Sequence, residues 1–357
     1  MSKRRAPFHS NAAFAGASAG VQGGGLFAAL DLGTNNCRLL IARSCAATAA
    51  GAPPFMVVDA FSRIVRLGEG LSQTGALSAP AMDRAIEALK VCAAKLRRRQ
   101  VAQARFVATE ACRRASNCDV FLARVEAETG LRIETISTAD EAALALAGCA
   151  PLLDASTPEA LVFDIGGGST ELMWAKLDAA GEPVLLDYLS VPYGVMNLAE
   201  REDCDCLSRD QFEALISQVR QKTEEFEARH AIRARIEAGK LQMLGTSGTV
   251  TTLAGIRMGL ACYDRSRVDG CHLDFAELRA VTDRLLALDC KARAQEPCIG
   301  PARADLVLAG CAILEAICRT WPVGRLRVAD RGVREGILLT LMRGAANPAP
   351  VMAIPAE

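Results

Sequence analysis

The stretch that decides the fold is Leu161-Val-Phe-Asp164-Ile-Gly-Gly-Gly168-Ser-Thr-Glu171. An apolar, strand-like run ends at Asp164, a turn of glycines and small hydroxyl residues follows, and a second apolar run begins at Leu172. Because glycine has no Cβ, such a turn can bring several backbone N–H groups close to one anion. The aspartate beside the turn would repel a phosphate unless a divalent cation lay between them. The pattern therefore predicts a site for phosphate together with a metal ion.

A related pattern occurs earlier, in Leu26-Phe-Ala-Ala-Leu-Asp31-Leu-Gly33-Thr-Asn-Asn-Cys-Arg38. It again places an aspartate at the end of an apolar run, ahead of a glycine and small polar residues. Expected strands precede expected helices in both halves of the chain, which indicates a duplicated α/β fold. We therefore predict two α/β domains, at 26–148 and 149–344, whose two turns face one cleft. The final helix is expected to pack back on the first domain.

The expected elements follow from the spacing of apolar residues. Strands are predicted at 26–32, 38–43, 55–65, 104–109, 131–137, 161–166, 171–177, 184–191 and 325–329. Helices are predicted after Ser78, from Glu141 to Cys149, after Ser208, over 275–287 and 302–319, and from Gly332.

The composition limits the classes of partner. With 357 residues the chain is long enough for two ordinary domains. Lys+Arg and Asp+Glu both number 41, so no overall field attracts the protein to nucleic acid or to a membrane surface. No apolar run reaches the length of a membrane span. A polyanionic substrate would have to be held by local basic residues.

The 14 cysteines are scattered through apolar or helical stretches, without a secretory signal, so we expect reduced thiols and a cytoplasmic protein. Cys204 and Cys206 form the one close pair, and neither they nor the three histidines have the spacing of a zinc site. Residues 1–25 and 345–357 are predicted to be disordered tails. The basic, hydroxylated start also allows a transit peptide, although a long amphipathic arginine stripe is missing.

Five further segments carry a resemblance to a known family. They are Val107-Ala-Thr109-Glu-Ala-Cys-Arg113-Arg-Ala-Ser-Asn117, Ile133-Glu-Thr-Ile-Ser137-Thr-Ala-Asp-Glu141-Ala, Ser190-Val-Pro-Tyr-Gly194-Val-Met-Asn197-Leu, Leu244-Gly-Thr246-Ser-Gly-Thr249 and Asp330-Arg-Gly-Val-Arg334-Glu-Gly336. With the two turns, they resemble the exopolyphosphatase/guanosine pentaphosphate phosphatase (Ppx/GppA) family of the actin-like ATPase superfamily. The resemblance covers residues 26–343. It implies two ribonuclease H-like domains with an interdomain cleft, in a short form without the HD-type metal domain of longer members.

The resemblance also implies roles for individual residues. Glu141 takes the position of the proposed general base, which would orient and deprotonate a water that attacks phosphorus. Glu110 and Asp140 are the rival carboxylates. The sequence departs from the family pattern at Thr138, where Gly is usual, and at Asn197, where many members have Arg, so one potential phosphate contact is missing.

The expected site can be given in full. Expected catalytic residues are Glu141, Glu171, Arg113 and Arg38, and the expected ligands of Mg²⁺ or Mn²⁺ are Asp164 and Glu171. Expected phosphate-binding residues are Asp31, Gly33, Thr34, Asn35, Thr109, Asn117, Gly166, Gly167, Gly168, Ser169, Gly194, Thr246, Ser247, Gly248 and Thr249.

The favoured function is removal of the terminal phosphate from inorganic polyphosphate by a homodimeric enzyme. Phosphoryl transfer depends mainly on positioning and charge neutralisation, which these residues would supply. Guanosine pentaphosphate presents the same terminal bond and remains an alternative substrate. A guanosine-nucleotide-binding regulator and an actin-like ATPase remain more distant alternatives.

Overall fold

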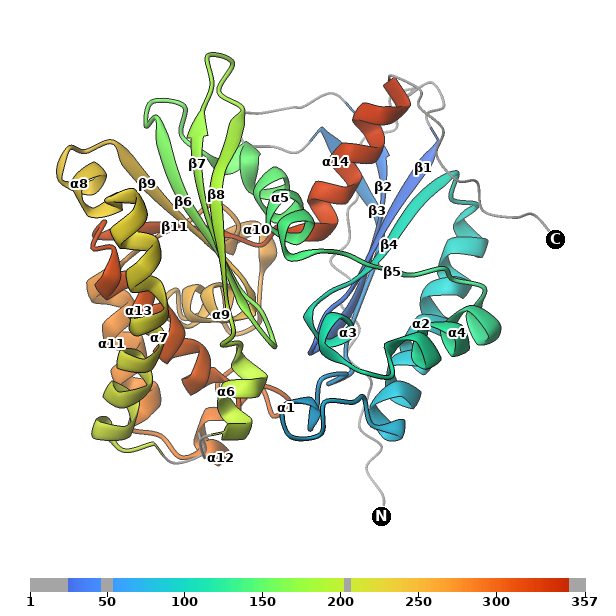
Figure 1. Ribbon diagram of the computed structural model, residues 1–357, viewed down its shortest axis with the longest axis horizontal. Helices are drawn as coiled ribbons and strands as arrows, with labels where there is room; N and C mark the ends of the chain where they lie inside the picture. The colour runs from blue at the N-terminus through green and yellow to red at the C-terminus, as the bar shows by residue number, and fades with distance from the viewer. Residues whose placement is uncertain (1–24, 46–53, 202–206, 347–357) are drawn as a thin grey trace.

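The computed structural model describes residues 25–45, 54–201 and 207–346. The expected tails therefore lie almost entirely outside the described residues, as do Cys204 and Cys206. The described chain forms two β-sheets that lie side by side, each covered by helices (Figure 1). None of its described helices has the length and apolar character needed to cross a membrane.

The first sheet has five strands in the order β3-β2-β1-β4-β5. Strand β1 runs antiparallel to β2 and parallel to β4. The strands are β1 (Leu26–Leu32), β2 (Asn36–Ser44), β3 (Phe55–Ile64), β4 (Gln103–Ala108) and β5 (Glu134–Thr135). The helices of this half are α1 (Leu71–Thr74), α2 (Ala79–Arg99), α3 (Glu110–Arg114), α4 (Cys118–Thr129) and α5 (Thr138–Cys149), followed by the short 3-10 helix at Ala150–Leu152.

The second sheet has six strands in the order β10-β11-β9-β6-β7-β8. The strands are β6 (Glu159–Ile165), β7 (Thr170–Leu177), β8 (Pro183–Val191), β9 (Leu241–Thr246), β10 (His272–Asp274) and β11 (Arg325–Ala329). The helices are α6 (Val195–Arg201), α7 (Arg209–His230), α8 (Ile232–Glu237), α9 (Gly248–Arg257), α10 (Arg265–Val268), α11 (Phe275–Leu286), α12 (Cys290–Arg293), α13 (Val307–Thr320) and α14 (Val333–Ala346).

The two sheets repeat one topology. Strands β8-β7-β6-β9-β11 follow the same order and directions as β3-β2-β1-β4-β5: an antiparallel meander and then parallel strands. This is the order of the ribonuclease H-like fold, so the predicted duplication is confirmed. Strand β10 is an addition at the far edge of the second sheet.

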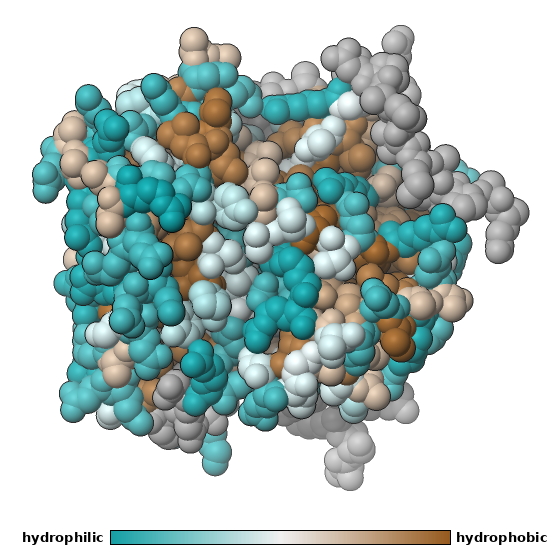
Figure 2. Space-filling model, in the orientation of Figure 1, coloured by the Kyte–Doolittle hydropathy of each residue, from teal (hydrophilic) through white to brown (hydrophobic). Residues whose placement is uncertain are grey.

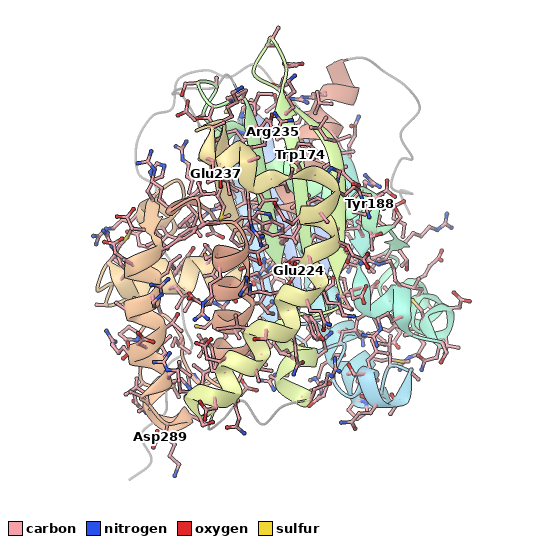
Figure 3. The ribbon with its side chains drawn as sticks, turned by 60° about the vertical axis from the view of Figure 1, so that its left-hand side comes forward. Trp174, Tyr188, Glu224, Arg235, Glu237 and Asp289 are labelled. Atoms are coloured by element: carbon pink, nitrogen blue, oxygen red, sulfur yellow. The ribbon has the colours of Figure 1, made fainter. Side chains whose placement is uncertain are left out.

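Each sheet is buried on both faces. On β1, Ala28 and Leu30 pack into a cluster with α2 and α4, whereas Phe27 and Ala29 pack into another cluster with α5 and α14. On the second sheet, α7, α9, α11 and α13 cover the outer face. Figure 3 views the molecule with α7 in front of the strands, where Trp174 of β7 is labelled. Alternate strand residues therefore supply two layers of core, which explains the nearly continuous apolar runs.

Helices α5 and α14 lie between the two sheets (Figure 1) and share one apolar cluster with both. They approach each other through glycines. A Cβ on Gly336 would lie 1.9 Å from the carbonyl oxygen of Leu144, and a Cβ on Gly148 would lie 2.1 Å from that of Gly332. The final helix, α14, contacts β1 and α5 of the first half.

The element boundaries differ from the predictions in a few places. The strand predicted at 131–137 is reduced to Glu134–Thr135, because its flanks are a loop and the N-terminus of α5. The helix predicted at 302–319 begins only at Val307, after a series of turns. Several elements carried no predicted boundary, among them β9, α4 and α9. The expected domain boundary falls at the end of α5.

The surface agrees with the balanced charge of the sequence. Figure 2 shows hydrophobic side chains in several separate patches among polar ones on the visible face. Twelve of the cysteines lie in the described part, and those buried in the cores, such as Cys37, Cys92 and Cys149, are free thiols.

Candidate active site

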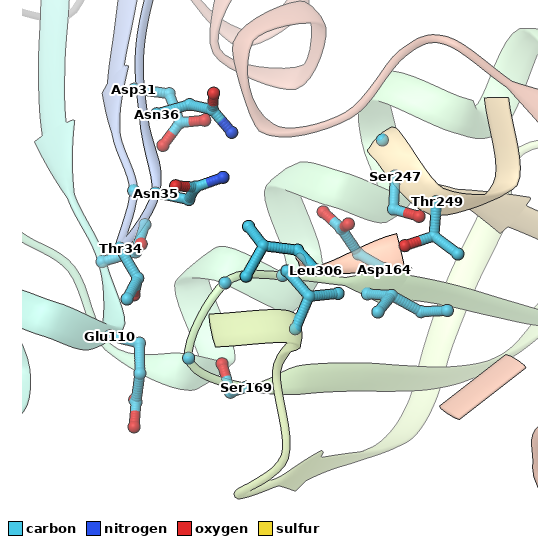
Figure 4. Close-up of a pocket in the computed structure, with 18 of the residues that line it drawn as sticks. Asp31, Thr34, Asn35, Asn36, Glu110, Asp164, Ser169, Ser247, Thr249 and Leu306 are labelled. Atoms are coloured by element: carbon cyan, nitrogen blue, oxygen red, sulfur yellow. The ribbon is translucent and has the colours of Figure 1, made fainter. Parts of the chain in front are cut away.

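A cavity between the two halves brings the predicted turns together (Figure 4). Its wall includes Asp31 and residues 33–36 from the first turn, and 164–169 from the second turn. The turns are in direct contact, because a Cβ on Gly167 would lie 3.0 Å from Cβ of Thr34 and 3.1 Å from the amide nitrogen of Asn35. The prediction that both turns face one cleft is therefore confirmed.

The closed arrangement is supported by contacts across the cleft. Arg66 of the first half donates to both carboxylate oxygens of Asp305 at 3.1 and 2.9 Å. The amide of Gly70 donates to Glu200 of α6 at 3.1 Å. These bonds tie the loop behind the first turn to the second half, since the backbone amide of Arg66 itself donates to the carbonyl of Asn35.

The second turn presents its backbone amides to the cavity. The carbonyls of Gly166 and Gly167 accept from the amides of Val195 and Met196 at 3.0 and 2.8 Å, on the side of α6. In a trans peptide the N–H points opposite to the C=O, so the amides of the next residues point away from α6. Within the described chain, the amides of Gly167 and Gly168 donate to no protein acceptor. Such unpartnered amides are suited to an anion, as the sequence led us to expect.

The first turn is built in the same way. The carbonyl of Asn35 accepts from the amides of Val65 and Arg66, and that of Thr34 accepts from the amide of Gly68, so both carbonyls face away from the cavity. The side chain of Asn35 is buried in the wall, and its Oδ1 has no hydrogen-bond partner among the described residues. A buried amide oxygen without a partner is costly, and a ligand in the cavity would remove that cost.

The residues that follow the two turns, and that pair with the two aspartates across the strands, have opposite charges. The strand register pairs Asp31 with Arg38 across β1 and β2, and Asp164 with Glu171 across β6 and β7. Asp31, Arg38 and Asp164 line the cavity. Glu171 does not; it is buried, and its Oε1 accepts from the hydroxyls of Ser169 at 2.6 Å and Ser190 at 3.0 Å. Glu171 thus stands beside Asp164 in the sheet, with one of its oxygens committed to serines.

The carboxylates of the second turn are perturbed. Burial raises the pKa of Asp164 to about 6, and the negative charge of Asp31 adds to the shift while Arg38 opposes it. Burial likewise raises the pKa of Glu171 to about 7, with a further contribution from Asp164. Burial raises the pKa of Asp31 as well. Carboxylates in such surroundings gain from a nearby cation, which favours their charged form.

The residues present fit a partly hydrated divalent cation. Asp31 and Asp164 both face the cavity and interact electrostatically, and Asn35 offers an unpartnered oxygen in the wall of the same cavity. No group of three His, Cys, Asp or Glu side chains within the described chain forms a complete metal cage. Mg²⁺ commonly takes one or two carboxylates and completes its shell with waters and substrate phosphate.

Glu141 lies in the first turn of α5 and lines the cavity. Helix α5 begins after Ser137, whose hydroxyl accepts from the amide of Asp140. Arg113 donates to Glu141 at 2.7 Å and to Glu110 at 3.1 Å, so it holds the Glu141 carboxylate in place. Burial nevertheless raises the pKa of Glu141 well above its usual range, and the charge of Glu171 raises it further.

Several predicted residues have other positions than expected. Arg113 does not line the cavity, because its guanidinium is engaged by two carboxylates and the carbonyl of Ile136. Asn117 uses its side-chain amide on the backbone of Leu77, at 2.8 and 3.0 Å, and lies outside the cavity wall. Gly194 lies behind the second turn, where a Cβ would come within 2.4 Å of the Gly167 backbone.

The third glycine/hydroxyl turn forms the far wall of the cavity (Figure 4). Ser247, Gly248 and Thr249 line it at the start of α9, and the Ser247 hydroxyl caps this helix by accepting from the amide of Val250. Ser247 has a φ of 144°, an unusual conformation for a residue with a side chain. Thr246 lies deeper, where its hydroxyl donates to the carbonyl of Arg331.

The sequence reasoning missed Arg303. This residue lines the cavity, and within the described residues neither its guanidinium group nor that of Arg38 forms an ion pair or hydrogen bond with a protein group. Burial lowers the pKa of Arg303, and repulsion from Arg38 lowers it further, so both guanidinium groups face one space. Arg303 precedes α13 in a segment expected to be helical, where an arginine indicates a solvated surface. Thr109, the N-cap residue of α3, and the rival carboxylate Glu110 also line the cavity.

Comparisons with known proteins agree with this geometry. Residues 44–344 match the Ppx/GppA phosphatase family. The chain is 32% identical over 331 residues to exopolyphosphatase 2 of Mycobacterium tuberculosis, covering 88% of this chain and 98% of that protein. It is 30% identical over 319 residues to the guanosine-5'-triphosphate,3'-diphosphate pyrophosphatase of Pseudoalteromonas translucida, covering 89% of this chain and 59% of that protein.

Solved structures show the same fold. A Ppx/GppA family member from Aquifex aeolicus matches with a TM-score of 0.72 at 26% identity, covering 91% of this chain and 99% of its own. An exopolyphosphatase from Cytophaga hutchinsonii matches with a TM-score of 0.78 at 24% identity, covering 89% and 98% of the two chains.

Proposed function

The chain belongs to the Ppx/GppA phosphatase family and is a phosphoanhydride hydrolase, and from this premise we propose that it removes the terminal phosphate of inorganic polyphosphate as orthophosphate. The observation that carries the proposal is the convergence of Glu141 and both glycine turns on one cavity. A curated relative that shares nearly its whole length with this chain is an exopolyphosphatase.

Glu141 acts as the general base. Its carboxylate faces the cavity, and Arg113 fixes its orientation at 2.7 Å. The raised pKa of Glu141 makes its ionised form a stronger base than an ordinary glutamate, once the carboxylate has lost its proton. Glu141 would accept a proton from the water as that water attacks the terminal phosphorus.

The two turns hold the phosphate groups. The free amides of Gly167 and Gly168 bind phosphate oxygens, and Arg38 and Arg303 neutralise further negative charge. Such prearranged donors stabilise charge that develops in the transition state. The residues that would hold Mg²⁺ or Mn²⁺ are Asp164 and Asp31; the ion would neutralise phosphate oxygens near the second turn.

A second candidate substrate is guanosine pentaphosphate. Ile299, Leu306 and Val307 add an apolar wall to the cavity beside the third turn. Inorganic polyphosphate has no apolar surface to bury there, whereas a nucleoside does. We regard the guanosine nucleotide as the alternative because this wall would suit it.

The first experiment measures orthophosphate release from long-chain polyphosphate, guanosine pentaphosphate and ATP, with Mg²⁺ present. We expect the highest kcat/KM with polyphosphate. A higher value with guanosine pentaphosphate would favour the alternative substrate. ATP turnover without release of phosphate from the other two compounds would contradict the proposal.

The second experiment tests the base. Glu141→Gln should lower kcat by about 10²–10⁴-fold, the usual value of a positioned base, while substrate binding survives because the cradle lies elsewhere. Asp140→Asn is the matched control, since this neighbour is exposed and its carboxylate accepts a hydrogen bond from the hydroxyl of Ser137. Near-normal activity in Glu141→Gln, together with loss of activity in Asp140→Asn, would show that the base is misassigned.

A further inference from the structure

Asn197 lies directly behind the glycine turn that faces the cavity. It belongs to α6, and its side chain is buried, with 6% of the residue exposed. The position differs from the pattern of the resembling family, where arginine is frequent. A buried amide must satisfy its donors and acceptor inside the protein, so the partners of Asn197 show what the side chain does.

These partners fix the turn from behind. Nδ2 donates to the carbonyl of Gly168 at 2.6 Å and to that of Pro192 at 3.3 Å. Oδ1 accepts from the amide of Gly194 at 2.7 Å. The side-chain amide of Asn197 therefore connects the turn to the segment that leads into α6. Because Nδ2 donates to two carbonyls and Oδ1 accepts from one N–H, the positions of its oxygen and nitrogen are assigned.

With the bond to Gly168, three consecutive carbonyls of the turn accept hydrogen bonds on the side of α6. The carbonyls of Gly166 and Gly167 are held by the backbone amides of α6, and the carbonyl of Gly168 is held by Asn197. By the geometry of the trans peptide, the third bond turns the amide of Ser169 toward the cavity. That amide also donates to no acceptor within the described chain. Backbone amides of α6 hold two of the three peptides, and a side chain holds the third.

We propose that Asn197 is a positioning residue, which orients the Gly168–Ser169 peptide so that the Ser169 amide binds a phosphate oxygen of the substrate. The inference rests on the proposed phosphohydrolase function and names a residue that the site itself does not contain. An arginine at position 197 could not accept a hydrogen bond from the Gly194 amide. This chain therefore supports the turn in a way that an arginine at this position could not.

The test uses two variants and one control. Asn197→Asp keeps an acceptor for Gly194 but sets a carboxylate oxygen against the Gly168 carbonyl, which repels it. Asn197→Ala removes both contacts without adding charge and serves if the aspartate variant does not fold. Leu198→Ala is the control, because Leu198 is buried in the core next to Asn197 and its apolar side chain cannot hydrogen-bond to the turn; it should lower Tm and leave KM unchanged.

The readouts are kcat and KM for polyphosphate, and the Kd of inorganic tripolyphosphate from calorimetry. We expect Kd and KM to rise about tenfold or more in Asn197→Asp and less in Asn197→Ala, with a smaller change in kcat. Unchanged Kd and KM in folded Asn197 variants would overturn the proposal, as would an equal rise in Leu198→Ala. If the wild-type protein binds tripolyphosphate but releases no phosphate from any substrate, the proposed function fails and the binding data still decide the role of Asn197.

Discussion

The turn between β1 and β2 and the turn between β6 and β7 have the same backbone and different chemistry. Each is closed by the same hydrogen bond, from Gly33 to Asn36 and from Gly166 to Ser169, both at 2.9 Å. In each turn, backbone carbonyls accept hydrogen bonds on the side away from the cavity. The residue that faces the aspartate across the strands is Arg38 in the first turn but Glu171 in the second.

This difference gives the two turns different electrostatic surroundings. Arg38 lowers the pKa of Asp164 and partly neutralises Asp31, so the first turn adds positive charge for phosphate oxygens. The second turn collects two carboxylates in a buried place, which raises the pKa of both. A duplicated element thus supplies the same turn twice, and under the proposed function one strand position would decide which copy attracts a cation.

The largest effect after loss of the base is expected at Asp164. Asp164→Asn should raise the Mg²⁺ concentration for half-maximal activity on the order of 100-fold, since loss of a ligand costs at least as much as loss of its supporting partners. Asp31→Asn should raise it less, because Arg38 already lies opposite Asp31. Activity at graded Mg²⁺ concentrations after removal of metal by a chelator measures both. Equal metal dependence in the two variants would break the proposed division.

The two turns also differ in the space that their glycines leave for a side chain. A Cβ on Gly194, which supports the second turn, would lie 2.4 Å from backbone atoms of Gly167 and Gly168, whereas a Cβ on Gly33 would meet nothing closer than 3.6 Å. Gly194→Ala should destabilise the fold by about 1–3 kcal/mol and reduce activity. Gly33→Ala should stay within about 0.5 kcal/mol of the wild type. Thermal unfolding and phosphate release test the pair, and equal losses would contradict the comparison.

The smallest expected effect is on the pH profile. Because the pKa of Glu141 is raised, the acid limb of kcat should lie well above pH 4.5, and activity should fall as the base gains its proton. Glu171 contributes part of this shift through its negative charge. Glu171→Gln should therefore lower the pKa of Glu141 and move the acid limb to lower pH. A limb that stays in place or moves to higher pH would show that Glu171 does not act on the base.

Much of the site could be predicted because its signals are local. A strand that ends in Asp and a glycine-containing turn fix the backbone of residues 31–36 and 164–169 within a few positions. Glu141 follows the N-cap Ser137 at a spacing that places it in the first turn of α5. Arg113 was expected to neutralise phosphate oxygens, and the sequence could not show that Glu141 and Glu110 occupy its guanidinium.

Other features depend on residues far apart in the chain. Arg303 joins Arg38 only because the two halves close on each other, with Arg66 bound to Asp305 across the cleft. Asn197 indicated a missing phosphate contact in the sequence, and its partner Gly168 lies 29 positions away. Asn117 indicated a phosphate ligand, but its amide is used on Leu77, 40 positions earlier.

The sequence by itself determined the two turns and the duplicated order of strands and helices, since each follows from spacing within short segments; it also placed Glu141 at the start of a helix, where the family resemblance proposes a base. The tertiary structure alone decided which charges meet. Burial between the sheets sets the pKa of Asp164, Glu171 and Glu141, and the glycine contacts of α5 and α14 allow the sheets to lie close enough for one cavity. Electrostatic energies depend on distance and on removal from water, and both are properties of the packed molecule rather than of any segment.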